Sequence, residues 1–241
     1  AAEAERALAG YLAKRRLGRP LVTLKLATSL DGRIAARNGD SKWITGPAAR
    51  ARAHQLRGLH DAILVGAGTM RADDPRLTVR LPSMPDEVLR QPLRVVLDSM
   101  LSLPPDSQLA TSLEDGPVLL LHAPDAPADR MKSLAQTGIM LEAIARNADG
   151  HLDLSAVLGA LVEHGVGSVL IEGGSGMAAA FMRAGLVDRL AWFRAPVLLG
   201  GDGLAALGGL DLNSVSEASR WQCEGSDMLG PDRLDLFARK E

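Results

Sequence analysis

A glycine-rich segment late in the chain carries the strongest signal for ligand binding. A strand-like apolar run at residues 168–172 leads into Gly173, Gly174 and Gly176, and a helical stretch follows at residues 177–183. Glycines let the backbone approach a ligand closely, and the N–H groups at a helix start attract anions. The pattern predicts a phosphate cradle, and a tight strand-to-helix turn without a ligand is the alternative.

This cradle does not have the pattern of a Rossmann-type dinucleotide site. That fold places Gly-x-Gly-x-x-Gly after the first strand and an acidic residue at the end of the following strand. Here the glycines come late, and the nearest later acid, Asp188, precedes the next strand-like run. We therefore expect a different nucleotide-binding architecture.

Polar residues also follow earlier strand-like runs. The Asp-Gly pair at residues 31–32 is by itself an ordinary turn signal. Ser41, Trp43 and Thr45 precede a helix whose first turn contains Pro47. A helix N-terminus beside hydroxyl groups is again suited to an anion.

Arginines are concentrated in the next part of the chain. The helix after Pro47 carries Arg50, Arg52 and Arg57, of which Arg50 and Arg57 share one face, and a plain solvated surface is the alternative. Residues 66–80 then combine glycines, acids and further arginines. Open α/β folds bind ligands in the loops at the carboxyl ends of their strands. We therefore expect these segments to converge on one cleft.

The periodicity of apolar residues predicts the elements that position these loops. The clearest helix spans residues 153–164, with Asp153 as N-cap and Gly165 as stop signal. Strands and helices alternate, which predicts an α/β fold with a doubly wound, mostly parallel sheet. Two C-terminal runs without a helix between them, joined through residues 225–231, predict antiparallel strands at the sheet edge. The expected strands are residues 21–28, 61–66, 93–98, 117–122, 139–144, 168–172, 190–199, 220–224 and 233–238.

Composition excludes several classes of protein. Twenty-seven basic and 29 acidic residues give a net charge of −2, and aromatic residues make up 3% of the 241, so nucleic acid is not an expected partner. No apolar stretch is long enough to span a membrane, and no signal peptide is recognisable, so the expected location is cytoplasmic. Cys223 is the single cysteine, and a disulfide framework or cysteine-based zinc site within the chain is therefore excluded.

We expect one domain over residues 19–241, preceded by an N-terminal helix or connector over residues 1–18. The charged cluster Lys14, Arg15 and Arg16 is expected on the solvated face of that helix. Two segments rich in glycine, proline and polar residues, 81–92 and 104–116, are short enough to be connections within the domain.

The ordered motifs resemble those of a known family, the reductase domain of the bifunctional deaminase-reductase of riboflavin biosynthesis. The resemblance extends from about Arg19 to the C-terminus. It rests on Lys25-Leu26-Ala27, Ser29-Leu30-Asp31-Gly32-Arg33, Ser41-Lys42-Trp43-Ile44-Thr45, Asp61-Ala62-Ile63-Leu64-Val65-Gly66, Ala72-Asp73-Asp74-Pro75, Leu77-Thr78-Val79-Arg80 and Glu172-Gly173-Gly174.

The resemblance implies a dihydrofolate-reductase-like fold, NADPH as cofactor and a homodimer. It also implies the substrate, 5-amino-6-(5-phosphoribosylamino)uracil, whose ribosyl group is reduced to ribityl by a hydride delivered to the first carbon of the sugar. Carried over by motif, the residues that bind the substrate are Ser41, Arg57, Leu77, Arg80 and Glu172. Those that bind the cofactor are Ala27, Trp43, Thr69, Asp73, Ser99, Gly174, Ser175, Gly176, Met177, Ala178, Ala179 and Ala180.

The residue types agree with these roles. A sugar phosphate is bound well by guanidinium groups such as those of Arg57 and Arg80, which can contact it through two parallel hydrogen bonds. Asp73 is the candidate catalytic residue, and we hypothesise that it positions the reacting groups or relays a proton. The zinc deaminase signature of the bifunctional enzymes is absent. Deamination is therefore not expected of this chain, which is expected to be fused to or to work with a deaminase domain.

Other functions remain open. An enzyme of the same fold could act on the diaminopyrimidine before its deamination or on a dihydrofolate-type substrate, and a non-catalytic nucleotide-binding sensor is also possible. Arg57 and Arg80 argue against dihydrofolate, but no residue separates the two pyrimidines. The preference for NADPH over NADH and the homodimer follow from the resemblance alone. Residues 190–199 and the C-terminal strands are the candidate dimer surfaces.

Overall fold

The structure is a computed structural model that describes residues 9–81 and 90–240. Its internal contacts divide the chain into two compact units. The first unit contains His54–Leu170 together with the N-terminal segment up to Leu21, and the second contains Val22–Ala53 and Ile171–Glu241.

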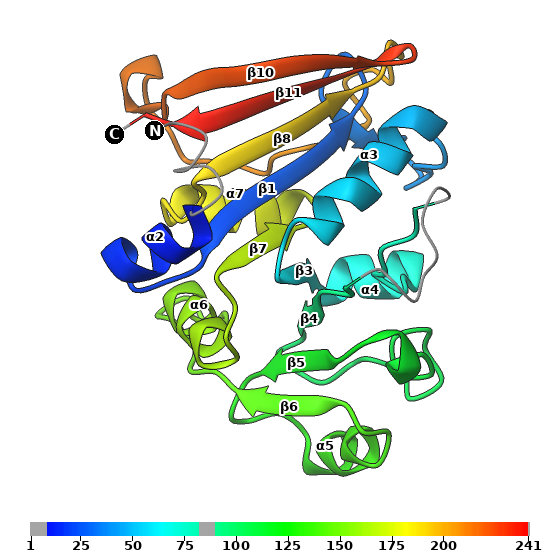
Figure 1. The fold of residues 1–241 in the computed structure, drawn as a ribbon, viewed down its shortest axis with the longest axis vertical. Coiled ribbons are helices and arrows are strands. Elements are labelled where there is room, and N and C mark those ends of the chain that lie inside the picture. Colours follow the sequence, from blue (N-terminus) through cyan, green and yellow to red (C-terminus); the bar gives the residue numbers. More distant parts are fainter. Residues whose placement is uncertain (1–8, 82–89, 241) are drawn as a thin grey trace. The chain divides into compact units, whose positions relative to one another are not determined.

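Parallel strands form the sheet of the first unit. The strands β3 (Ala62–Gly66), β4 (Leu93–Leu97), β5 (Val118–His122) and β6 (Met140–Ala143) pair in this order, and β7 (Ser168–Ile171) follows on the other side of β3. Figure 1 shows β5 and β6 side by side. All five residues of β5 are buried, as expected of a strand covered on both faces.

Helices complete the first unit. They are α2 (Ala9–Leu17), α4 (Ala67–Asp73), α5 (Ala128–Ala135), α6 (Leu154–Glu163), the last turn of α3 (Pro47–Gly58) and the short η2 (Leu113–Asp115). The Asp153 side chain accepts hydrogen bonds from Ser155 N (2.8 Å) and Ala156 N (3.1 Å), so it caps α6 as predicted. Gly165 ends the helix with φ +79°, which also agrees with the prediction.

The core of the first unit contains α4 and the strands next to it. Met70 of α4 is 1% exposed and packs with Val65, Val96 and Leu120. The remaining members of this cluster are Ile63, Leu77, Leu101, Leu103, Leu109, Ala110, Val118, Ala126, Leu134 and Ile139. Leu77 belongs to the loop that follows α4, so the core fixes this loop as well.

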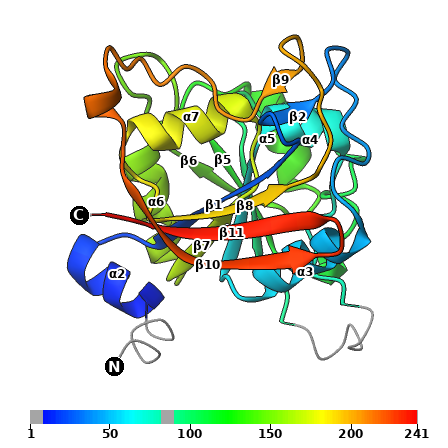
Figure 2. The same ribbon diagram turned by 90° about the horizontal axis from the view of Figure 1, so that it is seen from above.

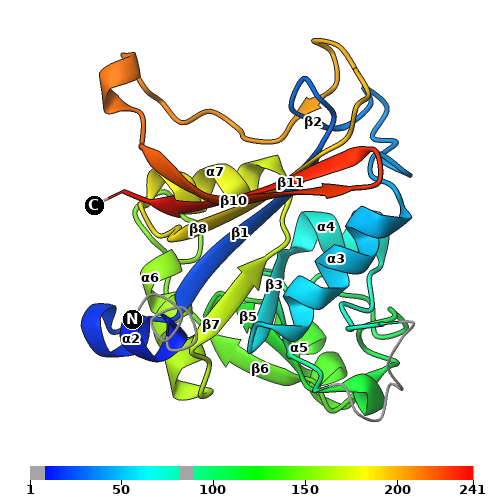
Figure 3. The ribbon, with the colours of Figure 1, turned by 45° about the horizontal axis from the view of Figure 1, so that its top comes forward.

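The second unit contains a mixed sheet with strand order β10-β11-β8-β1. Strand β1 (Leu21–Thr28) runs parallel to β8 (Arg189–Arg194), whereas β11 (Asp232–Arg239) and β10 (Trp221–Leu229) are antiparallel to their neighbours. Helix α7 (Ser175–Arg183) lies on one face of this sheet, near β8 (Figure 2). Strands β2 (Arg33–Ala35) and β9 (Leu204–Ala205) form a separate small sheet, and a long connection containing η3 (Val215–Glu217) leads from β9 to β10 (Figure 3).

The predicted fold class is confirmed: parallel strands dominate, and the C-terminal strands are antiparallel. The strand expected at residues 190–199 ends earlier, at Arg194. Beyond it, the backbone of Val197 pairs with Leu30 of another loop, and Leu198 is 72% exposed. The connection expected at residues 225–231 is also shorter, because β10 continues through an irregularity between Cys223 and Gly225.

Several sequence expectations concern the ends and loops of the chain. Lys14, Arg15 and Arg16 of α2 are exposed as predicted, and the rest of the expected N-terminal helix lies outside the described residues. The breaker-rich segment 81–92 lies mostly outside them as well. Helix α4 was not expected, because its short sequence contains Gly68 near its start and the charged residues Arg71 and Asp73 near its end. Within the described part of the chain, no helix is long and apolar enough to cross a membrane.

Candidate functional site

The glycine-rich segment forms the N-terminus of α7 in the second unit. Gly174 is the N-cap, with extended φ and ψ of −73° and 176°, and no side chain caps the helix. A Cβ atom on Gly176 would meet nothing within 4 Å, whereas one on Gly173 would lie 2.8 Å from Met177 Sδ. A side chain at position 173 would therefore crowd Met177, and Gly176 leaves open space beside the N–H groups of the first turn. This arrangement suits a phosphate.

Glu172, immediately before these glycines, forms an ion pair with Lys25. The distance from Lys25 Nζ to Glu172 Oε2 is 3.6 Å, and the two side chains are 18% and 10% exposed. Lys25 also lies 5.9 Å from the centre of the Phe193 ring. The sequence motif that contains Lys25 did not indicate that this residue pairs with Glu172. A half-buried ammonium and carboxylate side by side can bind hydroxyl and amide groups of a polar ligand without adding net charge.

Trp43 and its neighbours form a second candidate binding feature of this unit. The Trp43 side chain is 71% exposed, and the Arg50 guanidinium stacks on its ring at 4.4 Å. Arg50 also donates to the carbonyl of Thr45 (2.8 Å), so that this arginine holds the segment in place. Ser41 is half-buried, and its carbonyl accepts a hydrogen bond from Ile44. An exposed indole face offers a stacking surface for a planar ring.

Asp31 connects two loops of the second unit. Its carboxylate accepts hydrogen bonds from Ser29 Oγ (2.6 Å), Gly200 N (2.8 Å) and Leu199 N (3.2 Å). The Ser29 hydroxyl lowers the pKa of Asp31 most, the backbone N–H groups lower it further, and the value is about 2 instead of the ordinary 3.8. The Asp-Gly pair, which alone indicated only a turn, therefore also anchors the loop at residues 199–200.

We expect Asp31→Asn to destabilise the protein in a pH-dependent way. Because folding lowers the pKa of Asp31, its stabilising effect is fully present above 3.8 and is lost as the pH falls towards about 2. The variant should melt at a lower temperature than the unchanged protein near neutral pH, and the difference should shrink in acid. Thermal unfolding followed by circular dichroism across this range measures it. A difference that is constant with pH would contradict the expectation, and Asp227→Asn on exposed β10 is the control.

The first unit carries the candidate catalytic acid. Asp73 is the last residue of α4 and is exposed, and Thr69 on the same helix is half-buried. Asp74 ends the helix in the left-handed region with φ +38°, and its carboxylate accepts a hydrogen bond from Gln108 N (2.9 Å). Ser99 follows β4, and its carbonyl accepts a hydrogen bond from Ala123 N (3.1 Å).

The arginines proposed for the substrate differ in their surroundings. Arg57 on α3 is half-buried and donates to the carbonyl of Thr78 (3.0 Å). Arg80 is exposed, and no hydrogen bond or ion pair links its guanidinium to another described residue. Leu77 lies between them in the chain, and its side chain is 3% exposed, so it can offer a ligand little more than its backbone.

The assigned residues are shared by the two units. The first unit contains Arg57, Thr69, Asp73, Leu77, Arg80 and Ser99. The second unit contains Ala27, Ser41, Trp43, Glu172 and residues 174–180. Their convergence on one cleft remains a prediction. A cavity of about 260 Å³ in the first unit is lined by none of them: its walls are Asp61, Arg90, Gln91, Leu93, Pro117, Met140, His164, Gly165 and Val166.

A mostly parallel sheet with antiparallel C-terminal strands and an uncapped, glycine-bearing helix start define an α/β protein whose helix start is suited to a phosphate. Residues 20–234 match the family model of the RibD C-terminal domain. The chain therefore belongs to this family, the reductase domains of riboflavin biosynthesis. The resemblance predicted from the motifs is confirmed.

Curated relatives give the same result. The chain is 39% identical over 218 residues to the riboflavin biosynthesis protein RibD of Bacillus amyloliquefaciens, which covers 90% of the chain and 57% of that protein. It is 37% identical over 232 residues to RibD of Mycobacterium tuberculosis, with 95% and 58% covered. The chain thus spans less than two thirds of the length of these relatives.

Solved structures confirm the fold. RibD of Acinetobacter baumannii is similar with a TM-score of 0.86 and 30% identity, covering 99% of this chain and 63% of that one. A deaminase/5-amino-6-(5-phosphoribosylamino)uracil reductase of Thermotoga maritima has a TM-score of 0.79 and 28% identity, with 99% and 62% covered. A riboflavin biosynthesis reductase of Saccharomyces cerevisiae, at 20% identity and TM-score 0.71, shares the fold over 99% of this chain and 100% of its own.

Proposed function

We propose that this chain is an NADPH-dependent reductase that converts the ribosyl group of 5-amino-6-(5-phosphoribosylamino)uracil to a ribityl group. The observation that carries the proposal is the family match over residues 20–234, which includes every residue assigned to cofactor or substrate. The name of the Thermotoga maritima relative, which includes this reductase activity, supports the same substrate.

The residues present fit a dinucleotide cofactor. The start of α7 has no side-chain cap, Gly176 leaves open space beside it, and Trp43 offers an exposed ring face. NADPH would be held by Ala27, Trp43, Thr69, Asp73, Ser99 and residues 174–180. When bound, it supplies the hydride for the reduction.

Other side chains would hold the substrate and supply the proton that its reduction requires. Arg80, whose guanidinium is exposed, would bind the phosphate together with Arg57. Glu172, fixed by Lys25, would accept hydrogen bonds from substrate hydroxyl or N–H groups. Reduction of an opened sugar requires a proton as well as a hydride, and the exposed carboxyl group of Asp73 would position or relay that proton.

Further properties belong to the same proposal. We propose a homodimer, a cytoplasmic location and a deaminase domain that is fused to this chain or works with it. The curated relatives extend well beyond the matched segment, which supports an additional domain in those proteins.

The proposal is tested by following the loss of NADPH absorbance with each of two substrates, the aminopyrimidine ribosyl phosphate after deamination and the one before it. We expect rapid oxidation with the deaminated compound only. Oxidation with the other compound would reassign the substrate. No oxidation with either would contradict a reductase and favour a nucleotide-binding sensor, which binding of NADPH measured by calorimetry would then reveal.

A further inference from the structure

The loop that follows α4 has no secondary structure of its own. Residues 76–80 form neither helix nor strand, yet Leu77, Thr78 and Val79 are buried. Leu77 also has φ +54°, a left-handed conformation that is unfavourable for a leucine. Buried backbone groups need hydrogen-bond partners, and an unfavourable backbone conformation persists only when its surroundings impose it. The side chains around this loop must therefore hold it.

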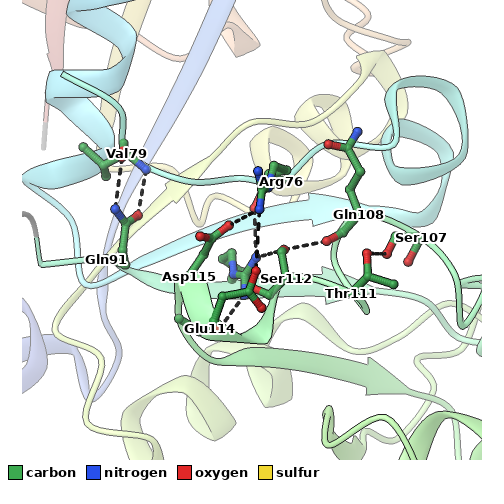
Figure 4. Close-up of polar contacts among 11 residues, drawn as sticks. Arg76, Val79, Gln91, Ser107, Gln108, Thr111, Ser112, Glu114 and Asp115 are labelled. Carbon is green, nitrogen blue, oxygen red and sulfur yellow. Dashed lines mark hydrogen bonds and ion pairs between the residues drawn. The ribbon is translucent and has the colours of Figure 1, made fainter. Parts of the chain in front are cut away.

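Gln91 holds the loop at Val79. Its side-chain oxygen accepts a hydrogen bond from Val79 N (2.8 Å), and its side-chain nitrogen donates to Val79 O (3.0 Å), as Figure 4 shows. A carboxamide carries an acceptor and a donor side by side, so it can pair with both backbone groups of one residue as a neighbouring strand would. No other uncharged side chain of similar length has this combination.

Arg94 holds the start of the same loop. This residue of β4 is fully buried, and its Nη1 donates to Arg76 O (3.1 Å) and to Ser112 Oγ (2.8 Å). Its Nη2 donates to Ser112 O (2.7 Å) and to Gly116 O. The Arg76 side chain lies 2.9 Å from the carboxylate of Asp115 (Figure 4). Asp115 belongs to the same turn as Ser112 and Gly116. Arg94 thus joins the loop to residues 112–116.

Helix α3 completes the attachment. Arg57 donates to Thr78 O (3.0 Å), and the N–H of Arg80 donates to His54 Nδ1 (3.2 Å). The backbone is therefore bound at Arg76, Thr78, Val79 and Arg80. Of the exposed side chains in this loop, that of Arg76 is paired with Asp115, whereas that of Arg80 has no hydrogen bond or ion pair to another part of the described chain.

We propose that Gln91 and Arg94 are positioning residues for substrate binding: they fix the backbone of residues 76–80 and thereby the direction in which Arg80 meets the substrate phosphate. The inference rests on the proposed function. Neither residue belongs to the motifs that carried the family resemblance, and both act on Arg80 through the loop and not by touching the ligand.

Gln91→Met tests the proposal, because it keeps the length of the side chain and removes both hydrogen bonds. We expect the KM for the ribosyl phosphate to rise about fivefold to tenfold, as the loss of one to two hydrogen bonds would produce. The KM for NADPH and kcat should change less than about twofold. Binding of ribose 5-phosphate without cofactor, measured by calorimetry, should weaken by the same factor. Gln91→Glu, which keeps an acceptor for Val79 N but loses the donor to Val79 O, should weaken binding as well.

Controls separate positioning from general stability. Gln136→Met changes an exposed glutamine after α5 and should leave all these values unchanged. Amide hydrogen exchange at Val79 should be faster in Gln91→Met than in the unchanged protein. A normal KM and normal ribose 5-phosphate binding in Gln91→Met would overturn the proposal, even if the melting temperature fell. An unchanged protein that neither binds ribose 5-phosphate nor oxidises NADPH would instead contradict the proposed function.

Discussion

Asp73→Asn is expected to lower kcat by about 10²-fold to 10⁴-fold, the usual contribution of a group that transfers a proton in the transition state. Asparagine has the same shape and can still form hydrogen bonds, but it cannot take up or release a proton at neutral pH. The KM for NADPH should therefore change less than about threefold. Steady-state kinetics with saturating NADPH and varied substrate measure both values.

The control for Asp73 is Asp129→Asn, which removes an exposed carboxylate from the first turn of α5. It should leave kcat unchanged. A normal kcat in Asp73→Asn would exclude Asp73 from proton transfer. A large rise in the KM for NADPH at normal kcat would assign Asp73 to cofactor binding alone.

Arg94→Met is expected to lower the free energy of unfolding by about 3–5 kcal/mol, the range seen when one partner of a buried polar network is removed. The substitution would leave the carbonyls of Arg76, Ser112 and Gly116 without their donor. Burial lowers the pKa of the Arg94 guanidinium, and nearby Asp115 opposes this effect. Urea unfolding followed by fluorescence or circular dichroism measures the loss.

Arg90→Met is the matched control for Arg94. The Arg90 side chain is 85% exposed, and its distance of 3.6 Å from Asp61 makes it a surface ion pair. Such pairs contribute about 0–1 kcal/mol, so the control should be nearly as stable as the unchanged protein. A loss of less than about 1 kcal/mol in Arg94→Met would show that the loop and the 112–116 turn find other donors.

The apolar periodicity of the sequence was enough to predict most of the sheet. Uninterrupted runs such as residues 118–122 become buried parallel strands, and Asp153 and Gly165 mark the ends of α6 where expected. The exceptions have physical reasons. Residues 195–199 do not continue the strand: Pro196, Val197 and Leu198 are exposed, and the backbone of Val197 pairs with Leu30 of another loop. Helix α4 is short and is stabilised by burying Met70, which its charged sequence does not indicate.

The contacts within the candidate site were less predictable, because they join residues far apart in the chain. The ion pair of Lys25 with Glu172 and the pairing of Gln91 with Val79 require the fold to be known. Arg94 is an extreme case: a buried arginine in an apolar strand gives no signal of which carbonyls it binds. By contrast, the motifs around Asp31, Asp73 and Glu172 were recognisable in the sequence because their local order is distinctive.

The transfer of deuterium from labelled NADPH to the product tests whether this chain reduces the ribosyl group. The chain would be incubated with 5-amino-6-(5-phosphoribosylamino)uracil and NADPH carrying deuterium at the transferable position, and the product analysed by mass spectrometry and NMR. We expect a ribityl product with a single deuterium on the first carbon of the sugar chain. A product without deuterium at that carbon, or an unchanged ribosyl compound, would contradict it.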